Sequence, residues 1–189
     1  MFRAGLSGTN WTGKTETIRR FVREHSELAI KTVSLTSLVD RCPFPMMEEQ
    51  TVEASQWMIQ QVGAMCTKDS AEMQLFDRTP VDILAFTLYA ESRTGNESPK
   101  VLEDALELVK YFDILFYVPV VDEWPVNTSA SRSKIQFALK MDSYMRTVIE
   151  RFSLDVVSLP WDLAKRQSLL SEYFRAYKLS ARTDDESVQ

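Results

Sequence analysis

The residues with the clearest chemical potential lie near the N-terminus, where two glycines precede a lysine and a threonine. They follow the spacing G-x-x-x-x-G-K-[ST], as Gly8, Thr9, Asn10, Trp11, Thr12, Gly13, Lys14 and Thr15. A glycine-rich turn before a helix exposes successive backbone N–H groups, and the helix dipole favours an anion there. The lysine reaches the β- and γ-phosphates of a nucleotide, and the threonine hydroxyl ligates Mg²⁺. The segment therefore predicts a P-loop that binds a nucleoside triphosphate with Mg²⁺.

The sequence on either side of this loop has the character that the motif requires. Apolar side chains at every second position, Phe2, Ala4 and Leu6, predict a strand over residues 2–6. Residues 14–27 are rich in helix formers and have apolar side chains on one face, which predicts a helix. Strand, loop and helix in this order separate a true P-loop from a chance match to the pattern.

Elements of both kinds continue along the chain and alternate. Further strands are expected at 30–35, 71–76, 114–121 and 155–159. Helices are expected at 48–65, 80–91, 101–111, 134–152 and from Pro160-Trp161-Asp162 to about 177. Strands that alternate with helices imply a parallel sheet covered on both faces. The predicted fold is α/β, a three-layer P-loop NTPase sandwich around a five-stranded parallel sheet.

Composition narrows the possible class of protein. A chain of 189 residues with 44% hydrophobic residues fits one domain, expected over 1–178, with a flexible tail at 179–189. The apolar run at 114–121 is far shorter than the ~20 residues that span a bilayer, so we expect no membrane segment and a cytoplasmic location. The cysteines, Cys42 and Cys66, form no disulfide framework, and with the single histidine they form no zinc cluster of familiar spacing.

Two absences direct attention to kinases among P-loop proteins. The chain has no Asn-Lys-x-Asp guanine signature, and it is short for the helical lid domain of ring-forming ATPases. It resembles the nucleoside and nucleotide kinase superfamily, and more narrowly a small phage and bacterial ATPase/kinase group related to the nicotinamide riboside kinase domain. The P-loop, residues 76–82 and Leu159-Pro160 carry this resemblance, which covers nearly all of 1–178. It implies transfer of the γ-phosphate of ATP, with Mg²⁺, to a small nucleoside or nucleotide acceptor.

The resemblance also implies roles for an acidic residue and an arginine that follow one strand. In relatives of this type such a pair ends the strand beside the P-loop strand and faces the γ-phosphate and the acceptor, which assigns these roles to Asp77 and Arg78. A carboxylate holds Mg²⁺ together with Thr15 or accepts a hydroxyl proton, and a guanidinium clamps phosphate oxygens. Asp82, one helical turn later, is either an acceptor ligand or a partner of the helix dipole.

Other candidates lie in loops expected at the same edge of the sheet. Asp40 and Arg41 follow the second strand and are either acceptor ligands or an ordinary charged loop. Residues 127–134 suit a segment that closes over the triphosphate, with Arg132 as the cation that contacts the phosphates. Lys134 is a further candidate for this role, and Arg146 is a weaker one. By resemblance, Pro160 contacts the nucleotide base.

Some features keep alternatives open. Where similar loops have a small residue, this chain has Trp11, either a surface aromatic or a platform for a base or acceptor. Methionines such as Met46, Met47 and Met58 predict adaptable packing and would admit varied substrates if they lie near an acceptor cavity.

Trp11 and the cluster of Arg19, Arg20 and Arg23 motivate an alternative function, in which the acceptor is a hydroxymethylated pyrimidine within DNA. A net charge of −5 opposes strong DNA affinity. The remaining alternative is an ATP-binding regulator that has no acceptor.

Overall fold

All the strands that the structure describes belong to one parallel sheet. The computed structural model describes residues 1–68, 71–122, 124 and 130–186. The strands are β1 (Phe2–Ser7), β2 (Lys31–Ser34), β3 (Met73–Asp77), β4 (Ile114–Tyr117) and β5 (Val156–Ser158). Their order across the sheet is β2-β3-β1-β4-β5, with every pairing parallel. The predicted α/β fold with five parallel strands is confirmed.

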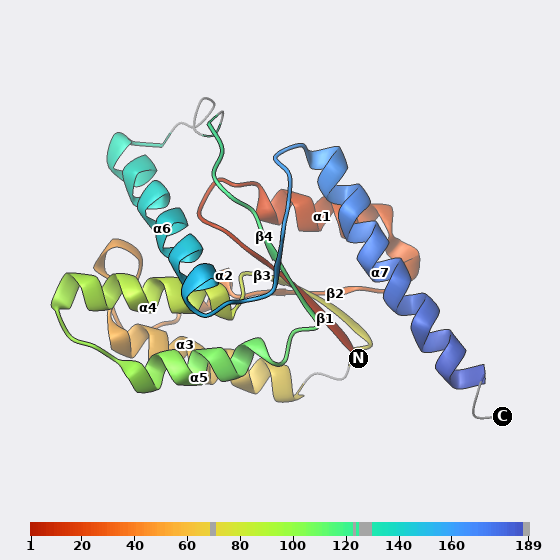
Figure 1. The fold of residues 1–189 in the computed structure, drawn as a ribbon, viewed down its shortest axis with the longest axis horizontal. Helices are drawn as coiled ribbons and strands as arrows, with labels where there is room; N and C mark the ends of the chain where they lie inside the picture. Colours follow the sequence, from red (N-terminus) through yellow and green to blue (C-terminus); the bar gives the residue numbers. More distant parts are fainter. Residues whose placement is uncertain (69–70, 123, 125–129, 187–189) are drawn as a thin grey trace.

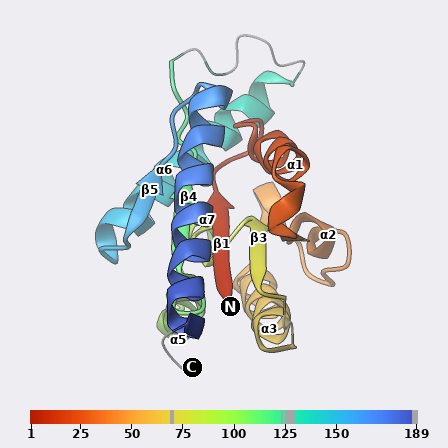
Figure 2. The same ribbon diagram turned by 90° about the vertical axis from the view of Figure 1, so that its right-hand side faces the viewer.

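Helices cover both faces of the sheet, as Figures 1 and 2 show. They are α1 (Lys14–Glu24), α2 (Thr36–Val39), α3 (Val52–Lys68), α4 (Pro80–Thr94), α5 (Pro99–Val109), α6 (Arg132–Arg151) and α7 (Leu163–Glu186), with short 3-10 turns at Ser26–Leu28 and Met47–Glu49. Helices α1 and α7 pack together on one face, and α3, α4, α5 and α6 contact one another on the other. The molecule therefore has three layers.

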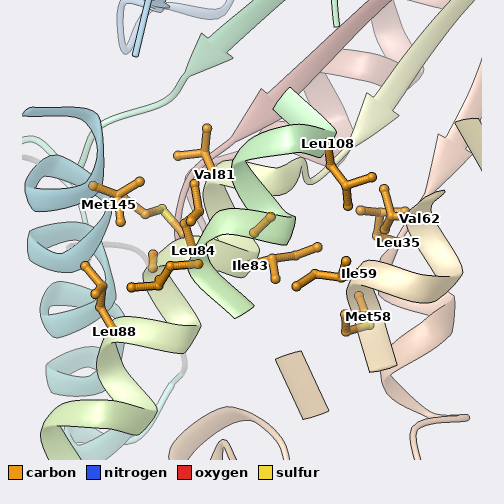
Figure 3. Packing of buried hydrophobic residues seen from close by; sticks show 14 of the residues in the cluster. Leu35, Met58, Ile59, Val62, Val81, Ile83, Leu84, Leu88, Leu108 and Met145 are labelled. Atoms are coloured by element: carbon orange, nitrogen blue, oxygen red, sulfur yellow. The ribbon is translucent and has the colours of Figure 1, made fainter. Parts of the chain in front are cut away.

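A separate apolar core lies on each face. The larger one joins the sheet to α3, α4, α5 and α6, and the smaller one joins it to α1 and α7. In Figure 3, Ile83 of α4 points toward Ile59 of α3, and Leu84 lies toward Met145 of α6. Because apolar burial is worth roughly 25 cal/mol per Å², these cores hold the strands and their terminal loops in place.

Several elements differ from the sequence expectations. Strand β4 ends at Tyr117 and not at 121, because Pro119 has no N–H with which to continue the ladder. The short helix α2 occupies Thr36–Val39, where no helix was expected. Helix α7 continues to Glu186 and does not end near 177, because no glycine or proline interrupts the sequence there. Among the described helices, none is long and apolar enough to cross a membrane.

The parallel arrangement decides where the loops meet. The carboxyl ends of parallel strands lie at one edge of a sheet, which is where α/β folds bind ligands. The P-loop follows β1, helix α2 follows β2, Asp77 ends β3, and Pro160 lies just after β5. The sheet thus places most of the predicted site residues along a single edge.

Candidate nucleotide-binding site

The P-loop backbone takes conformations that ordinary residues avoid. Gly8 has φ 148° and Gly13 has φ 81°, and Trp11 between them also has a positive φ of 60°. A Cβ on Gly8 would lie 2.7 Å from the carbonyl oxygen of Val118, so this position has room for glycine alone. Lys14 then begins α1. The loop is therefore a tight turn that leads into a helix N-terminus, as its spacing predicts.

Lys14 is held inside this turn. Its side chain is 6% exposed, and its Nζ donates to the Thr9 carbonyl at 2.7 Å and lies 3.5 Å from the Thr12 hydroxyl. Burial lowers the pKa of Lys14 to about 8, and the nearby Arg78 guanidinium adds a smaller lowering effect. The Asp82 and Asp77 carboxylates act in the opposite direction and raise this pKa. The amine thus lies at the phosphate loop with a proton that it loses more easily than an exposed lysine does.

Thr15 and Asp77 meet across the sheet edge. The Thr15 hydroxyl donates to Asp77 Oδ2 at 2.6 Å, although the two residues are 62 positions apart in the chain. The contact exists because β3 lies directly beside β1, which places the end of β3 against the first turn of α1. Hydroxyl and carboxylate oxygens are the ligands that Mg²⁺ prefers, and it binds through few protein groups plus phosphates and water. This pair therefore fits a magnesium ion.

Arg78 connects the P-loop to the next helix. Its backbone has φ 78°, and its N–H donates to the Leu6 carbonyl of β1 at 3.0 Å. The guanidinium donates to Asn10 Oδ1 at 2.8 Å and to Asp82 Oδ1 at 3.3 Å. One guanidinium nitrogen thus contacts the phosphate loop and another contacts α4.

Asp82 is a helix cap as well as a partner of Arg78. Its Oδ2 accepts from the backbone N–H of Thr79 at 2.9 Å, which completes a capping box at the start of α4. Burial raises the pKa of Asp82, while the Arg78 guanidinium opposes that rise. The dipole-partner interpretation of Asp82 is thus supported by geometry, and the same carboxylate also borders a cavity beside the loop.

Two openings adjoin along this edge. A pocket of about 320 Å³ is lined by Asn10, Trp11, Gly13, Lys14, Thr15, Glu16, Thr36, Asp77 and Arg78. A narrower cavity beside it is mostly apolar and is lined by Leu35, Val39, Met46, Met47, Gln50, Ser55, Met58, Arg78, Thr79, Asp82, Ile83 and Phe86. Arg78 borders both openings. The polar pocket suits phosphates, whereas the cavity, with a volume of about 30 Å³, is lined mainly by apolar side chains.

A profile of a family described as an AAA domain matches residues 3–166. The chain belongs to this AAA domain family. A search of curated proteins finds no match.

Solved structures share the fold of this AAA domain chain. Deoxyadenosine kinase from M. mycoides with dCMP and dCDP has a TM-score of 0.63 at 12% identity, over 93% of this chain and 100% of that one. Thymidylate kinase from Candida albicans has the same TM-score and identity, over 94% and 92% of the two chains. NadR protein in complex with NAD and AMP-PNP has a TM-score of 0.60 at 15% identity, over 92% of this chain and 49% of that one. The fold is thus that of nucleoside and nucleotide kinases.

The remaining predicted acceptor and lid residues lie outside both openings. Asp40 and Arg41 are exposed at the end of α2, and Arg41 Nε donates to the Ser37 carbonyl at 3.4 Å. Neither lines the apolar cavity, because the turn after β2 directs them to solvent. Arg132 and Lys134 are exposed in the first turn of α6, and residues 127–129 of the expected closing segment lie outside the described residues.

Arg146 has a different structural role from the one expected. Its Nε donates to Asp142 Oδ2 at 2.9 Å, and another guanidinium nitrogen donates to the Val120 carbonyl at 3.2 Å. Asp142 also accepts from the Tyr117 hydroxyl, and burial, together with this contact, raises the pKa of Tyr117. Arg146 therefore ties α6 to the segment after β4.

Arg166 was not among the residues that the sequence singled out. It is 2% exposed, and it donates to the Pro160 carbonyl at 2.6 Å and to the Thr12 carbonyl at 2.7 Å. A signal does exist in the sequence, because Arg166 occupies the same helix stripe as the buried Leu170 and Phe174, at i, i+4 and i+8. A charged residue in an apolar stripe marks a buried polar contact.

Proposed function

We propose that this protein is a kinase that transfers the γ-phosphate of ATP, with Mg²⁺, to a hydroxyl or phosphate of a nucleoside- or nucleotide-type acceptor. The observation that carries the proposal is the position of Arg78, whose side chain borders both the polar P-loop pocket and the apolar cavity beside it. A hydrolase needs a place for water only, whereas a kinase needs a second substrate beside the phosphate. Two adjoining openings with a shared guanidinium meet that need.

The P-loop residues bind the triphosphate in this proposal. Backbone N–H groups from Gly8 to Thr15 surround the phosphates, and the Lys14 ammonium exchanges the Thr9 carbonyl for β- and γ-phosphate oxygens. Thr15 and Asp77 would hold Mg²⁺, which supplies neutralisation of the negative charge on the phosphates. Their present hydrogen bond brings the two oxygens close enough to face one ion.

Arg78 and Asp77 act on the second substrate. Arg78 exchanges its contact with Asn10 for the transferred phosphoryl group, while Asp82 keeps the other side of the guanidinium in position. Asp77 orients an acceptor hydroxyl and accepts its proton. The acceptor oxygen forms a bond to the γ-phosphorus, the bond from that phosphorus to the β,γ-bridging oxygen breaks, and ADP leaves.

The apolar lining of the cavity favours a nucleoside-type acceptor. Its methionines, Met46, Met47 and Met58, lie with Phe86 around a mostly apolar space, where a flat uncharged base finds dispersion contacts. Similar solved structures have dCMP, dCDP or dATP bound, and these ligands support an acceptor of the nucleotide class. The buried Gln50 and Ser55 side chains supply polar groups at one side of the cavity.

A label-transfer experiment tests the proposal. The protein is incubated with γ-labelled ATP and Mg²⁺ against nucleosides, nucleotides and hydroxymethylated DNA, and the labelled product is identified. We expect label on a free nucleoside or nucleotide, and a loss of about 10²-fold or more in Arg78→Met because one phosphate clamp is removed. The matched control is Arg151→Met, which removes an exposed arginine at the end of α6 that lines neither opening. ATP binding without any labelled acceptor would leave the regulator alternative.

A second candidate is an acceptor within DNA, and one groove favours it. The groove lies between α1 and the edge strand β2 and is lined by Thr15, Ile18, Arg19, Val22, Arg23, Thr32, Val33, Ser34 and Asp77. It shares Thr15 and Asp77 with the phosphate pocket, so a strand lying along the arginines would reach the site of transfer.

Oligonucleotide binding separates this candidate from the first. The double variant Arg19→Ala/Arg23→Ala should weaken binding of a hydroxymethylated single strand, with a smaller salt dependence. The control is Arg20→Ala, which lies on the same helix but outside the groove and pairs with Glu24 at 2.8 Å. Equal binding by all three proteins would eliminate the DNA acceptor.

A further inference from the structure

Arg166 joins two loops that are far apart in the sequence. It lies on α7, yet its guanidinium contacts the Thr12 carbonyl of the P-loop and the Pro160 carbonyl of the loop after β5. The same nitrogen that reaches Thr12 also lies 3.3 Å from the Thr17 hydroxyl of α1. One rigid, planar group therefore sets the separation of these two loops.

The contacts of Arg166 are unusual for a buried charge. The hydrogen bonds described for its guanidinium go to carbonyl and hydroxyl oxygens. Among the described residues, no ion pair joins Arg166 to a carboxylate. Burial lowers the pKa of Arg166 to about 10, and Asp162 opposes this effect only through space. A buried cation without a close counter-ion is costly to retain, and an approaching anion offsets that cost. A polyphosphate in the P-loop, whose Thr12 carbonyl Arg166 contacts, is such an anion.

Arg166 also supports an exposed aromatic face. Its guanidinium carbon lies 5.3 Å from the centre of the Trp161 ring, which is 39% exposed. Trp161 follows β5, whereas the apolar cavity lies on the side of β2 and β3, with the P-loop strand between them. In the proposed function, the phosphates of the nucleotide occupy the P-loop, the γ-phosphate faces Arg78 and the acceptor occupies the cavity. The base of this nucleotide therefore lies toward Trp161.

We propose that Arg166 is a positioning residue that couples the two ends of the bound nucleotide, by locking the P-loop at Thr12 to the base-side loop at Pro160 and Trp161. The inference rests on the proposed function, because it requires a triphosphate in the P-loop. It goes beyond that function because it names the side chain that sets the distance between the phosphate site and the base site, although this side chain contacts neither the phosphates nor the base.

The test compares ATP with a ligand that has phosphates but no base. Dissociation constants of ATP and of inorganic tripolyphosphate, both with Mg²⁺, are measured by calorimetry for the wild-type protein and for Arg166→Lys. The lysine keeps the charge but reaches one carbonyl only, so ATP should bind about tenfold more weakly or worse. Tripolyphosphate should lose less than about threefold, because it occupies the P-loop alone. The control is Lys165→Met, an exposed neighbour on the same helix turn.

A second variant guards against a loss of folding. Trp161→Leu removes the partly exposed ring and leaves Arg166 in place, and it should weaken ATP but not tripolyphosphate, with an unchanged melting temperature without ligand. Equal losses for both ligands in Arg166→Lys, or no loss for ATP in either variant, would overturn the coupling and leave the proposed function intact. Failure of the wild-type protein to bind either ligand would overturn both.

Discussion

The phosphate pocket and the apolar cavity beside it are built in different ways. The pocket is formed largely by polar groups on a backbone that has positive φ at Trp11, Gly13 and Arg78. The cavity is formed by apolar side chains from α2, α3, α4 and the segment between α2 and α3. Only Arg78 belongs to both.

The difference separates chemistry from selectivity. Donors for a phosphate must point at one place, and a strained loop held by a sheet fixes them there. An apolar ring requires only volume and contact, which flexible methionines supply in many arrangements. We therefore expect changes in the pocket to affect catalysis strongly and changes in the cavity to alter the choice of acceptor mildly.

The largest effect should come from Lys14→Ala. This change removes the ammonium that contacts the β- and γ-phosphates, so the transfer rate should fall by roughly 10²-fold to 10³-fold, or about 3 to 4 kcal/mol. Label transfer from γ-labelled ATP measures the rate, and thermal unfolding shows that the fold is kept. Full transfer by a folded variant would contradict the assigned role of the P-loop.

A comparable effect on stability should come from Gly8→Ala. The new Cβ would meet the Val118 carbonyl oxygen at 2.7 Å and the residue would keep a φ of 148°, so the free energy of unfolding should fall by roughly 3 kcal/mol. The matched control is Gly95→Ala at the end of α4, where φ is 73° but no atom lies within 4 Å. That control should lose about 1 kcal/mol. Chemical denaturation measures both, and equal losses would show that the close approach at the pocket is unimportant.

The pH should act on the pocket through Lys14. Its pKa is lowered from 10.5 to about 8 in the folded protein without ligand, and phosphate binding needs the protonated amine. Above pH 8 ATP affinity should therefore fall by up to about tenfold per pH unit, as each binding event must take up a proton. Between these two pKa values the unfolded chain holds the proton that the folded protein has lost, so stability without ligand should rise with pH.

Lys14→Arg serves as the control for this pH dependence. An arginine at this position stays protonated, so the ATP affinity of the variant should be nearly independent of pH between about 7 and 9. Calorimetric titrations at several pH values measure both proteins. The same slope in the two proteins would show that another group controls binding.

The smallest effect should come from Phe86→Leu in the cavity. The ring contributes contact area without a directed bond, so the KM of the acceptor should change by less than about tenfold, or 1.4 kcal/mol, while the Kd of ATP stays constant. The control is Phe112→Leu, which alters a partly buried ring outside the cavity. Steady-state kinetics over the acceptor panel measures the difference. A large loss of ATP affinity in Phe86→Leu would contradict the separation of the two regions.

Sequence reasoning was most successful where a local rule acts. Gly8 and Gly13 were predicted to form a tight turn because a G-x-x-x-x-G-K-[ST] spacing between strand and helix has one backbone solution, and both have positive φ. Pro119 shows the limit of a hydrophobic run as a signal, since the expected strand to 121 ends at Tyr117. There the missing N–H outweighs the apolar pattern.

The acceptor side was less accessible to sequence reasoning. Asp40 and Arg41 follow a strand as an acceptor site requires, but the turn into and out of α2 leaves both exposed. The residues that do line the cavity come from separate elements and share only apolar character, which every core residue also has. Charge at a strand end is visible in a sequence, whereas the concavity of an apolar surface is not.

The sequence by itself determined the P-loop, the alternation of strands and helices, and the placement of Asp77 and Arg78 at a strand end. Each depends on neighbours within a few residues, where backbone sterics and side-chain periodicity act directly. Only the tertiary structure decided that Thr15 meets Asp77, that Arg78 borders two openings, and that Arg166 of α7 supports the P-loop. These contacts join residues from 62 to 154 positions apart, and the order of strands in the sheet, together with the packing of α7 against α1, brings them together.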